Sequence, residues 1–100
     1  MSYTDAKGGL KRILNRANRL GLPAWASAHA DKILAGCELR WQTVRADWRS
    51  GKIDRATYDR QYARTVNELC YTQHVISSFL GSLPREDHVG RFLREVKNHE

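Results

Sequence analysis

The heptapeptide WRSGKID, residues 48–54, separates two long runs of helical pattern at residues 24–50 and 54–80, and this separation decides the fold. Gly51 interrupts the pattern, and Asp54 is a residue type that caps the start of a helix. A connection this short makes two successive helices fold back on each other. The sequence therefore predicts a long antiparallel two-helix hairpin.

Apolar residues recur every three or four positions in both runs, which is the period of one helix face. The series in the first run is Trp25, His29, Ile33, Cys37, Trp41, Val44 and Trp48, and in the second run Tyr58, Tyr62, Val66, Leu69, Gln73, Ile76 and Leu80. Pairing the residues across the turn places Trp48 beside Tyr58 and Cys37 beside Cys70 or Leu69. Gly36, inside the first run, suggests a kink or a close helix crossing.

A shorter helix is predicted before the hairpin, at residues 9–20. Its apolar positions share one face, and Gly21 is suited to end it. Residues 1–6 are expected to form a flexible lead with Thr4 or Asp5 as the cap. The pair Gly8-Gly9 leaves the start of the helix open and gives a weak hint of an anion site at a helix N-terminus.

A second short helix is predicted after the hairpin, at residues 85–97. Its apolar stripe consists of Val89, Phe92, Leu93 and Val96. The expected architecture is all-α: a long antiparallel two-helix hairpin with a short basic N-terminal helix and a short C-terminal helix. We expect a single helical domain over residues 1–100, with helices at about 9–20, 24–50, 54–80 and 85–97.

The composition indicates a globular protein, because 41% hydrophobic and 28% charged residues are proportions that support a packed core. No apolar run is long enough to cross a membrane. The N-terminus lacks the apolar core of a signal peptide, so we expect a cytoplasmic protein. Cys37 and Cys70 are expected to be reduced residues of buried helix faces.

The sequence contains no motif that indicates catalysis, a metal site or a cofactor. The four histidines and two cysteines lack zinc-site spacing, although His29, His74 and the two cysteines could approach each other across the hairpin. No pair of carboxylates stands in an apolar setting, as acid catalysis with a raised pKa requires. Glu38, Asp59 and Glu68, which lie among arginines, are interpreted as members of solvated ion pairs. We therefore expect a protein that is not an enzyme.

Positive charge is the strongest compositional signal. The net charge is +6, and arginine supplies 12 of the 17 basic residues. Residues 7–20 contain five basic residues and no acidic one, and further basic residues surround the hairpin turn. A solvated face is one interpretation; phosphate contact along a nucleic acid and docking on an acidic protein surface are the others.

Aromatic residues accompany these cations. Three tryptophans lie in one predicted helix, and a two-helix layer is too thin to cover all of them, so Trp25 and Trp48 are expected to be exposed, whereas Trp41 is expected to pack on the third helix. Tryptophan, tyrosine and arginine are common anchors of protein interfaces. The candidate partner-binding residues, for protein or nucleic acid, are Lys11, Arg12, Arg16, Arg19, Trp25, Arg45, Trp48, Arg49, Lys52, Arg55 and Tyr58.

The chain resembles the small anti-RecBCD proteins of lambdoid phages in size, composition and general run, including KRILNRANRL at residues 11–20 and the turn at residues 48–54. This resemblance implies a non-catalytic protein that binds the host RecBCD helicase–nuclease through its RecC subunit. Such binding would alter the enzyme's action on DNA ends and favour phage recombination. If the chain is phage-encoded, the expected compartment is the host cytoplasm. The resemblance assigns no role to an individual residue.

The main alternative is a basic helical protein that binds DNA or RNA directly through phosphate contacts. Two further partners stay open. A prolyl isomerase could act on Leu22-Pro23 or Leu83-Pro84, which lie in predicted connections. A second copy of the chain could cover the outer side of the hairpin in a dimer.

Overall fold

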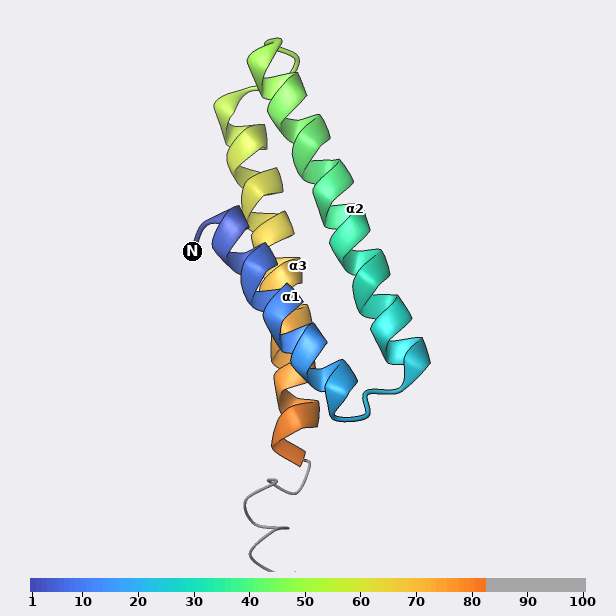
Figure 1. Ribbon diagram of the computed structural model, residues 1–100. Coiled ribbons are helices and arrows are strands. Elements are labelled where there is room, and N and C mark those ends of the chain that lie inside the picture. The colour runs from blue at the N-terminus through green and yellow to red at the C-terminus, as the bar shows by residue number, and fades with distance from the viewer. Residues whose placement is uncertain (83–100) are drawn as a thin grey trace, which may run out of the picture.

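The computed structural model describes residues 1–82, and in this range the chain forms three α-helices and no β-strand (Figure 1). α1 covers Tyr3–Arg19, α2 covers Ala24–Arg49 and α3 covers Arg55–Ser82. The predicted all-α class is confirmed. The helix predicted at residues 85–97 lies outside the described residues.

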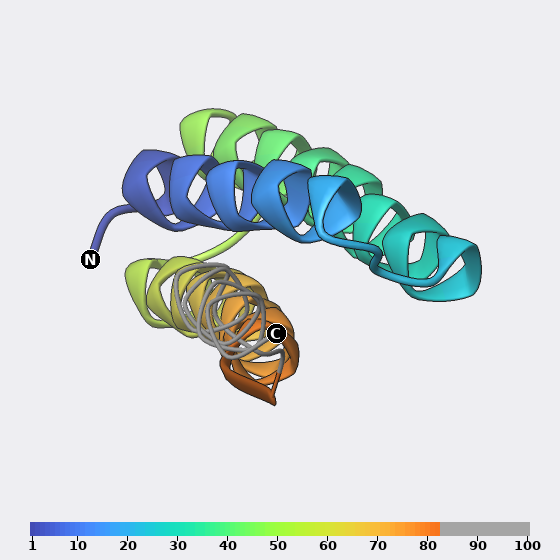
Figure 2. The same ribbon diagram turned by 60° about the horizontal axis from the view of Figure 1, so that its bottom comes forward.

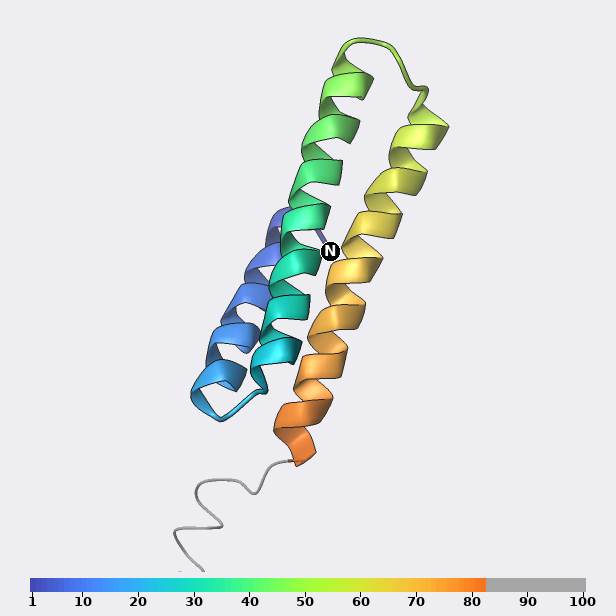
Figure 3. The same cartoon turned by 90° about the vertical axis from the view of Figure 1, so that its right-hand side faces the viewer.

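α2 and α3 form the predicted antiparallel hairpin, and their axes run side by side (Figure 3). Gly51 follows the end of α2 with a φ of 76°, a left-handed conformation that glycine adopts without steric cost. The carboxylate of Asp54 accepts a hydrogen bond from the Thr57 amide at 2.7 Å, so the predicted cap is present. α3 includes Gly81 and Ser82, so it extends past the predicted end at Leu80.

α1 begins earlier than the sequence predicts. The hydroxyl of Ser2 accepts a hydrogen bond from the Asp5 amide at 3.1 Å, so Ser2, and not Thr4 or Asp5, caps the helix. Tyr3 and Ala6 are buried. The expected flexible lead at residues 1–6 is therefore wrong, because apolar burial orders these residues as the first turns of α1.

The pair Gly8-Gly9 lies inside α1, and it marks a close approach between helices. A Cβ atom built on Gly9 would lie 2.8 Å from Oε1 of Gln73 on α3. Only the first four amides of a helix lack partners within the helix, so the amides of Gly8 and Gly9 are not a helix N-terminus. The anion site suggested by these glycines is excluded.

α1 and α3 run in the same direction, and α2 runs opposite to both (Figure 1). α3 is the central element, because it packs extensively on both other helices, whereas α1 and α2 touch each other less. In the view of Figure 2, α1 and α2 lie next to each other on one side of α3. The hairpin extends beyond the start of α1, so the molecule is a three-helix bundle whose two longer helices project as a tip.

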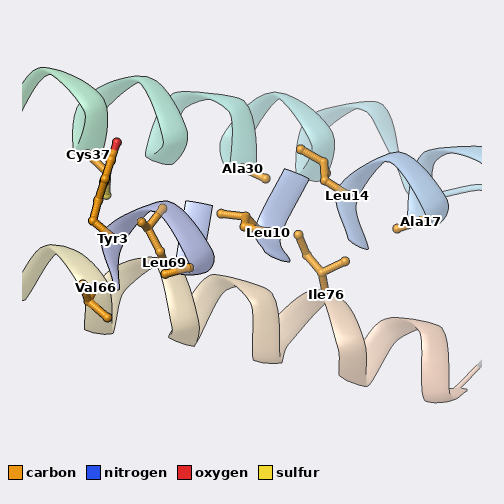
Figure 4. Packing of buried hydrophobic residues seen from close by; sticks show 10 residues of the cluster. Tyr3, Leu10, Leu14, Ala17, Ala30, Cys37, Val66, Leu69 and Ile76 are labelled. Carbon is orange, nitrogen blue, oxygen red and sulfur yellow. The ribbon is translucent and has the colours of Figure 1, made fainter. Parts of the chain in front are cut away.

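The core lies where the three helices meet (Figure 4). Leu10 of α1 and Leu69 of α3 are fully buried, and Cys37 of α2 is 1% exposed. The other buried apolar residues are Tyr3, Ala6, Leu14, Ala17, Ala30, Val44, Val66 and Ile76. α1 is thus an integral part of the core, and the core is not confined to the two helices of the hairpin.

Two ion pairs connect different helices. Nζ of Lys7 lies 2.7 Å from Oε2 of Glu38, and Nη1 of Arg40 lies 2.7 Å from Oε2 of Glu68. These partly exposed pairs agree with the interpretation of the acidic residues as ion-pair members. A Cβ built on Gly36 would meet no atom within 4 Å. Within residues 1–82, no second helix therefore crosses closely at Gly36, contrary to one of the two expectations for this glycine.

Candidate functional site

The hairpin tip carries most of the candidate partner-binding residues. The turn between α2 and α3 is closed by the Lys52 amide, which donates to the carbonyl of Asp47 at 2.9 Å, and by the Asp54 cap on the other side. The hydrogen bonds from Thr57 hold the pKa of Asp54 below its usual value. The tip is therefore a defined turn that keeps the last residues of α2 and the first residues of α3 together.

Aromatic rings form a continuous ladder that leads from the bundle core to the tip. Tyr3 stacks on Trp41 with ring centroids 5.2 Å apart, and Trp41 meets the edge of Tyr62 at 5.1 Å. Tyr58 lies 5.9 Å from Trp41 and 5.2 Å from Trp48, which is 37% exposed at the outer end. The predictions that Trp48 pairs with Tyr58 and that Trp41 packs on the third helix are confirmed.

Arginine side chains lie over this ladder. The guanidinium of Arg55 is 5.8 Å from the ring centroids of both Trp48 and Tyr58, and its Nε is 3.0 Å from Asp59. Arg45 lies 5.9 Å from the ring centroid of Trp41. Such cation–π contacts hold long side chains against aromatic faces. We call the group of Arg45, Trp48, Arg49, Lys52, Arg55 and Tyr58 the tip surface; all of them are exposed except Tyr58, which is half-buried.

The second group of candidate residues lies elsewhere. Lys11, Arg12, Arg16 and Arg19 are all exposed on α1, and within residues 1–82 none of them forms an ion pair. We call these four residues the α1 basic stripe. α1 begins beside the middle of α3 and runs away from the tip (Figure 1). The structure therefore separates the two basic groups.

Trp25 is separate from the tip as well. It is 77% exposed in the first turn of α2, as predicted. It borders an apolar cavity of about 240 Å³ between the start of α2 and the end of α3, with Leu22, Ala26, Val75, Ile76 and Phe79 in its walls. Of the residues around this cavity, the sequence had indicated only Trp25 as a candidate. The cavity itself depends on how α2 and α3 pack, and sequence spacing does not determine that packing. We call this feature the basal groove.

A polar cluster near the base of the tip was missed by the sequence reasoning. The Tyr3 hydroxyl donates to Glu38, and Nε2 of Gln42 donates to the same carboxylate at 3.2 Å. Lys7 and Tyr3 lower the pKa of Glu38 to about 2, while burial and this carboxylate raise the pKa of Tyr3. Tyr3, Ala6 and Leu10 have the spacing of one helix face. This spacing was the signal in the sequence that could have placed Tyr3 in a helix and toward the other helices.

Both cysteines are free thiols. Cys37 is buried, and this burial, together with the nearby Glu68, raises the pKa of its thiol. Cys70 is half-buried, and its Sγ lies 3.7 Å from Sδ of Met1. A raised pKa and a buried position are typical of a structural cysteine, since the thiolate is the reactive form.

Among residues 1–82, no group of three histidine, cysteine, aspartate or glutamate residues is close enough to hold a metal ion. In the same part of the chain, no helix combines the length and the apolar character needed to cross a bilayer.

Comparisons with known proteins add no relative to this description. The chain matches no protein-family model, no curated protein and no solved structure.

Proposed function

We propose that this chain is a non-catalytic binding protein that docks through its tip surface on an acidic surface of a host DNA-processing enzyme. The observation that carries the proposal is the half-exposed Trp48, held at the end of an aromatic ladder with Arg55 against its ring. Tryptophan, tyrosine and arginine supply most of the binding energy in many interfaces. A side chain already ordered before binding loses less entropy on docking.

The charge of the tip surface indicates the chemistry of the partner. Arg49 and Lys52 are exposed beside Trp48, and within the described residues neither forms an ion pair. Cations at the rim of an interface accelerate association with an acidic surface and exclude basic ones. The partner surface should therefore combine an apolar pocket for Trp48 with carboxylates around it.

The specific partner that we propose is the RecBCD helicase–nuclease, contacted at its RecC subunit. This choice rests on the resemblance to the anti-RecBCD proteins of lambdoid phages. Binding would change how the enzyme processes DNA ends and would favour phage recombination. The two proteins would meet in the bacterial cytoplasm.

The test is a binding titration of the full-length chain with purified RecBCD, followed by digestion of linear double-stranded DNA. We expect Trp48→Ala and Arg49→Glu each to weaken binding at least about tenfold, the effect of losing ~1.4 kcal/mol or more at a hot spot. The matched control is Arg12→Glu in the α1 basic stripe, which should bind like the wild type. Equal binding by all three variants would refute a tip-mediated contact, and absence of wild-type binding would refute RecBCD as the partner.

Direct nucleic-acid binding is the second candidate, and the α1 basic stripe favours it. Four exposed cations along one helix can neutralise about four phosphates, and each contact contributes roughly 0.9 to the salt slope of log affinity. Raising the salt from about 50 to 200 mM should then weaken DNA binding by about two orders of magnitude. Arg12→Glu should weaken this binding and Trp48→Ala should not, which is the reverse of the result expected for the protein partner.

A further inference from the structure

The α1 basic stripe lies on the side of α1 that faces away from the core. At 3.6 residues per turn, Arg12 and Arg19 lie almost opposite to Leu10 and Ala17, which are buried, and the other two cations of the stripe flank them. Residues 7–20 contain no acidic residue. Since the apolar face of α1 is already buried in the core, a partner of α1 meets only its cationic face. The stripe is therefore suited to a polyanion and not to an apolar partner.

The cations of the stripe also differ from other cations near the core. Lys7 and Arg40 bind Glu38 and Glu68 across helices, whereas within residues 1–82 no cation of the stripe has a carboxylate partner. Spacings of three and four residues bring like charges together on one helix face, so the cations of the stripe repel one another. A bound polyanion would remove this repulsion.

The length of the stripe matches the charge spacing of a DNA backbone. Lys11 and Arg19 are eight residues apart, which corresponds to about 12 Å at 1.5 Å per residue. One strand of duplex DNA presents a phosphate about every 3.4 Å of helix axis, so the stripe would run beside about three or four phosphates. Arginine binds phosphate oxygens through two N–H donors, and the exposed amide of Asn15 on the same face supplies a further donor. Charge and spacing therefore indicate the backbone of a duplex as the occupant.

The stripe and the tip surface lie at different levels of the bundle. Tyr3 stacks on Trp41, so these two residues are at the same level. Arg12 is nine residues from Tyr3 in the direction away from the tip, and Trp48 is seven residues from Trp41 toward the tip (Figure 1). At 1.5 Å per residue, Arg12 and Trp48 are therefore about 24 Å apart along the bundle.

This separation leaves the stripe open when the tip is docked. A protein interface of standard size buries about 800 Å² of each partner, which corresponds to a patch with a radius of roughly 16 Å. A patch of that size centred on Trp48 does not reach Arg12. The separation also exceeds the Debye length of about 8 Å at physiological salt, so an anion at one surface does not compete with an anion at the other.

We propose that the chain holds duplex DNA on its α1 basic stripe while its tip surface is docked on the DNA-processing enzyme. This inference rests on the function proposed above, in which the tip docks on that enzyme, and it adds a second partner at a second surface. Two sites on one chain raise the effective concentration of each partner near the other. The chain would thus keep the duplex close to the enzyme that acts on it.

The experiment measures the retention of purified RecBCD on beads that carry covalently closed circular duplex DNA. A closed circle has no ends, so binding of the enzyme to DNA ends does not contribute. We expect RecBCD to be retained at about 50 mM salt only when the full-length chain is present. The affinity of the chain for the circle should fall by about two orders of magnitude at about 200 mM salt, as four phosphate contacts predict. Binding of the chain to RecBCD in solution, without DNA, is measured in parallel.

Single substitutions separate the two surfaces. Arg12→Glu should weaken binding to the circle at least about tenfold and reduce RecBCD retention accordingly, while binding to RecBCD in solution stays like that of the wild type. Trp48→Ala should bind the circle like the wild type but retain at least about tenfold less RecBCD. The matched control is Arg64→Glu, because Arg64 is an exposed cation of α3 outside both surfaces and its reversal changes the net charge equally. This control should behave like the wild type in all three measurements.

The possible failures are distinguishable. If the wild-type chain binds RecBCD in solution but does not bind the circle, the DNA site is overturned, the proposed function stands, and an acidic surface of the enzyme becomes the partner of the stripe. Displacement of RecBCD from the chain by the circle would overturn simultaneous binding. Equal retention by Arg12→Glu and the wild type would overturn the assignment of the DNA site to α1. Absence of RecBCD binding in solution would refute the proposed function, and simultaneous binding with it.

Discussion

Tyr3 provides the sharpest test of the fold, because the structure makes the first turn of α1 a part of the core. Its side chain is 7% exposed, its ring stacks on Trp41, and its hydroxyl donates to Glu38. Truncation of a buried aromatic side chain to alanine typically costs about 3–5 kcal/mol. We expect Tyr3→Ala to lower the free energy of unfolding by about 3 kcal/mol, the lower end of that range, since a first helical turn can fray locally.

The hydroxyl contribution can be measured separately with Tyr3→Phe. A hydrogen bond to a charged group contributes about 1.5–3 kcal/mol when shielded from water. The side chain of Glu38 is 36% exposed, so screening by solvent reduces the expected loss to about 1 kcal/mol. The phenylalanine variant retains the ring stack, and therefore its stability should lie between those of the wild type and Tyr3→Ala.

Urea unfolding followed by far-UV circular dichroism would measure both losses as shifts of the midpoint at a constant slope. Thr4→Ala is the matched control, because Thr4 is exposed in the same turn and its substitution should change stability by less than about 0.5 kcal/mol. If Tyr3→Ala were as stable as Thr4→Ala, residues 1–6 would be a lead outside the cooperative fold, and the assignment of α1 to the core would fail.

Three further outcomes are expected from the same unfolding assay. Gly36→Ala should stabilise the protein by about 0.5–1 kcal/mol, because alanine favours the helix and its Cβ would meet no atom. Gly51→Ala should destabilise the protein by about 1 kcal/mol, because Gly51 has a φ of 76°, which is unfavourable for a residue with a Cβ atom. Leu69→Ala should lower the free energy of unfolding by about 3–5 kcal/mol, because Leu69 is fully buried. Leu39→Ala should lower it by less than about 0.5 kcal/mol, because Leu39 is 67% exposed. Glu38, whose pKa falls from 4.5 to about 2 on folding, should contribute stability that is present above pH 4.5 and is lost as the pH falls toward 2.

Each of these outcomes has a result that would contradict it. Destabilisation by Gly36→Ala would indicate that a Cβ atom at this position meets another atom, contrary to the open space around Gly36. Similar losses for Leu69→Ala and Leu39→Ala would place the core elsewhere. In the acid titration, Glu38→Gln is the control, and a decline below pH 4.5 as steep in this variant as in the wild type would show that other carboxyl groups carry the acid sensitivity.

The tip surface was largely predictable because its residues are close in sequence. Trp48 and Tyr58 flank a short turn, so helical spacing and an antiparallel return place them together without further information. Their ring centroids, 5.2 Å apart, confirm this pairing. The contact of Arg55 with both rings depends on side-chain conformation, and spacing alone does not determine it.

The basal groove and the polar cluster at Glu38 were not predictable in the same way. Tyr3 and Glu38 lie 35 residues apart, on helices whose relative rotation depends on how all three pack. The groove walls combine the start of α2 with the end of α3, and a cavity is defined only when both are placed. Sequence spacing marked Trp25 as surplus to the core, but it did not indicate the groove that Trp25 borders.

By itself, the sequence determined the all-α class, the hairpin and the basic character of the outer surfaces, because helical period, turn chemistry and charge are local properties. Only the tertiary structure decided the place of α1. The pattern of Tyr3, Ala6 and Leu10 was present in the sequence, but Gly8-Gly9 lowers local helix propensity and obscured it. Burial against α3, where Gly9 approaches Gln73 closely, outweighs that local cost, and it makes the hairpin one part of a three-helix core.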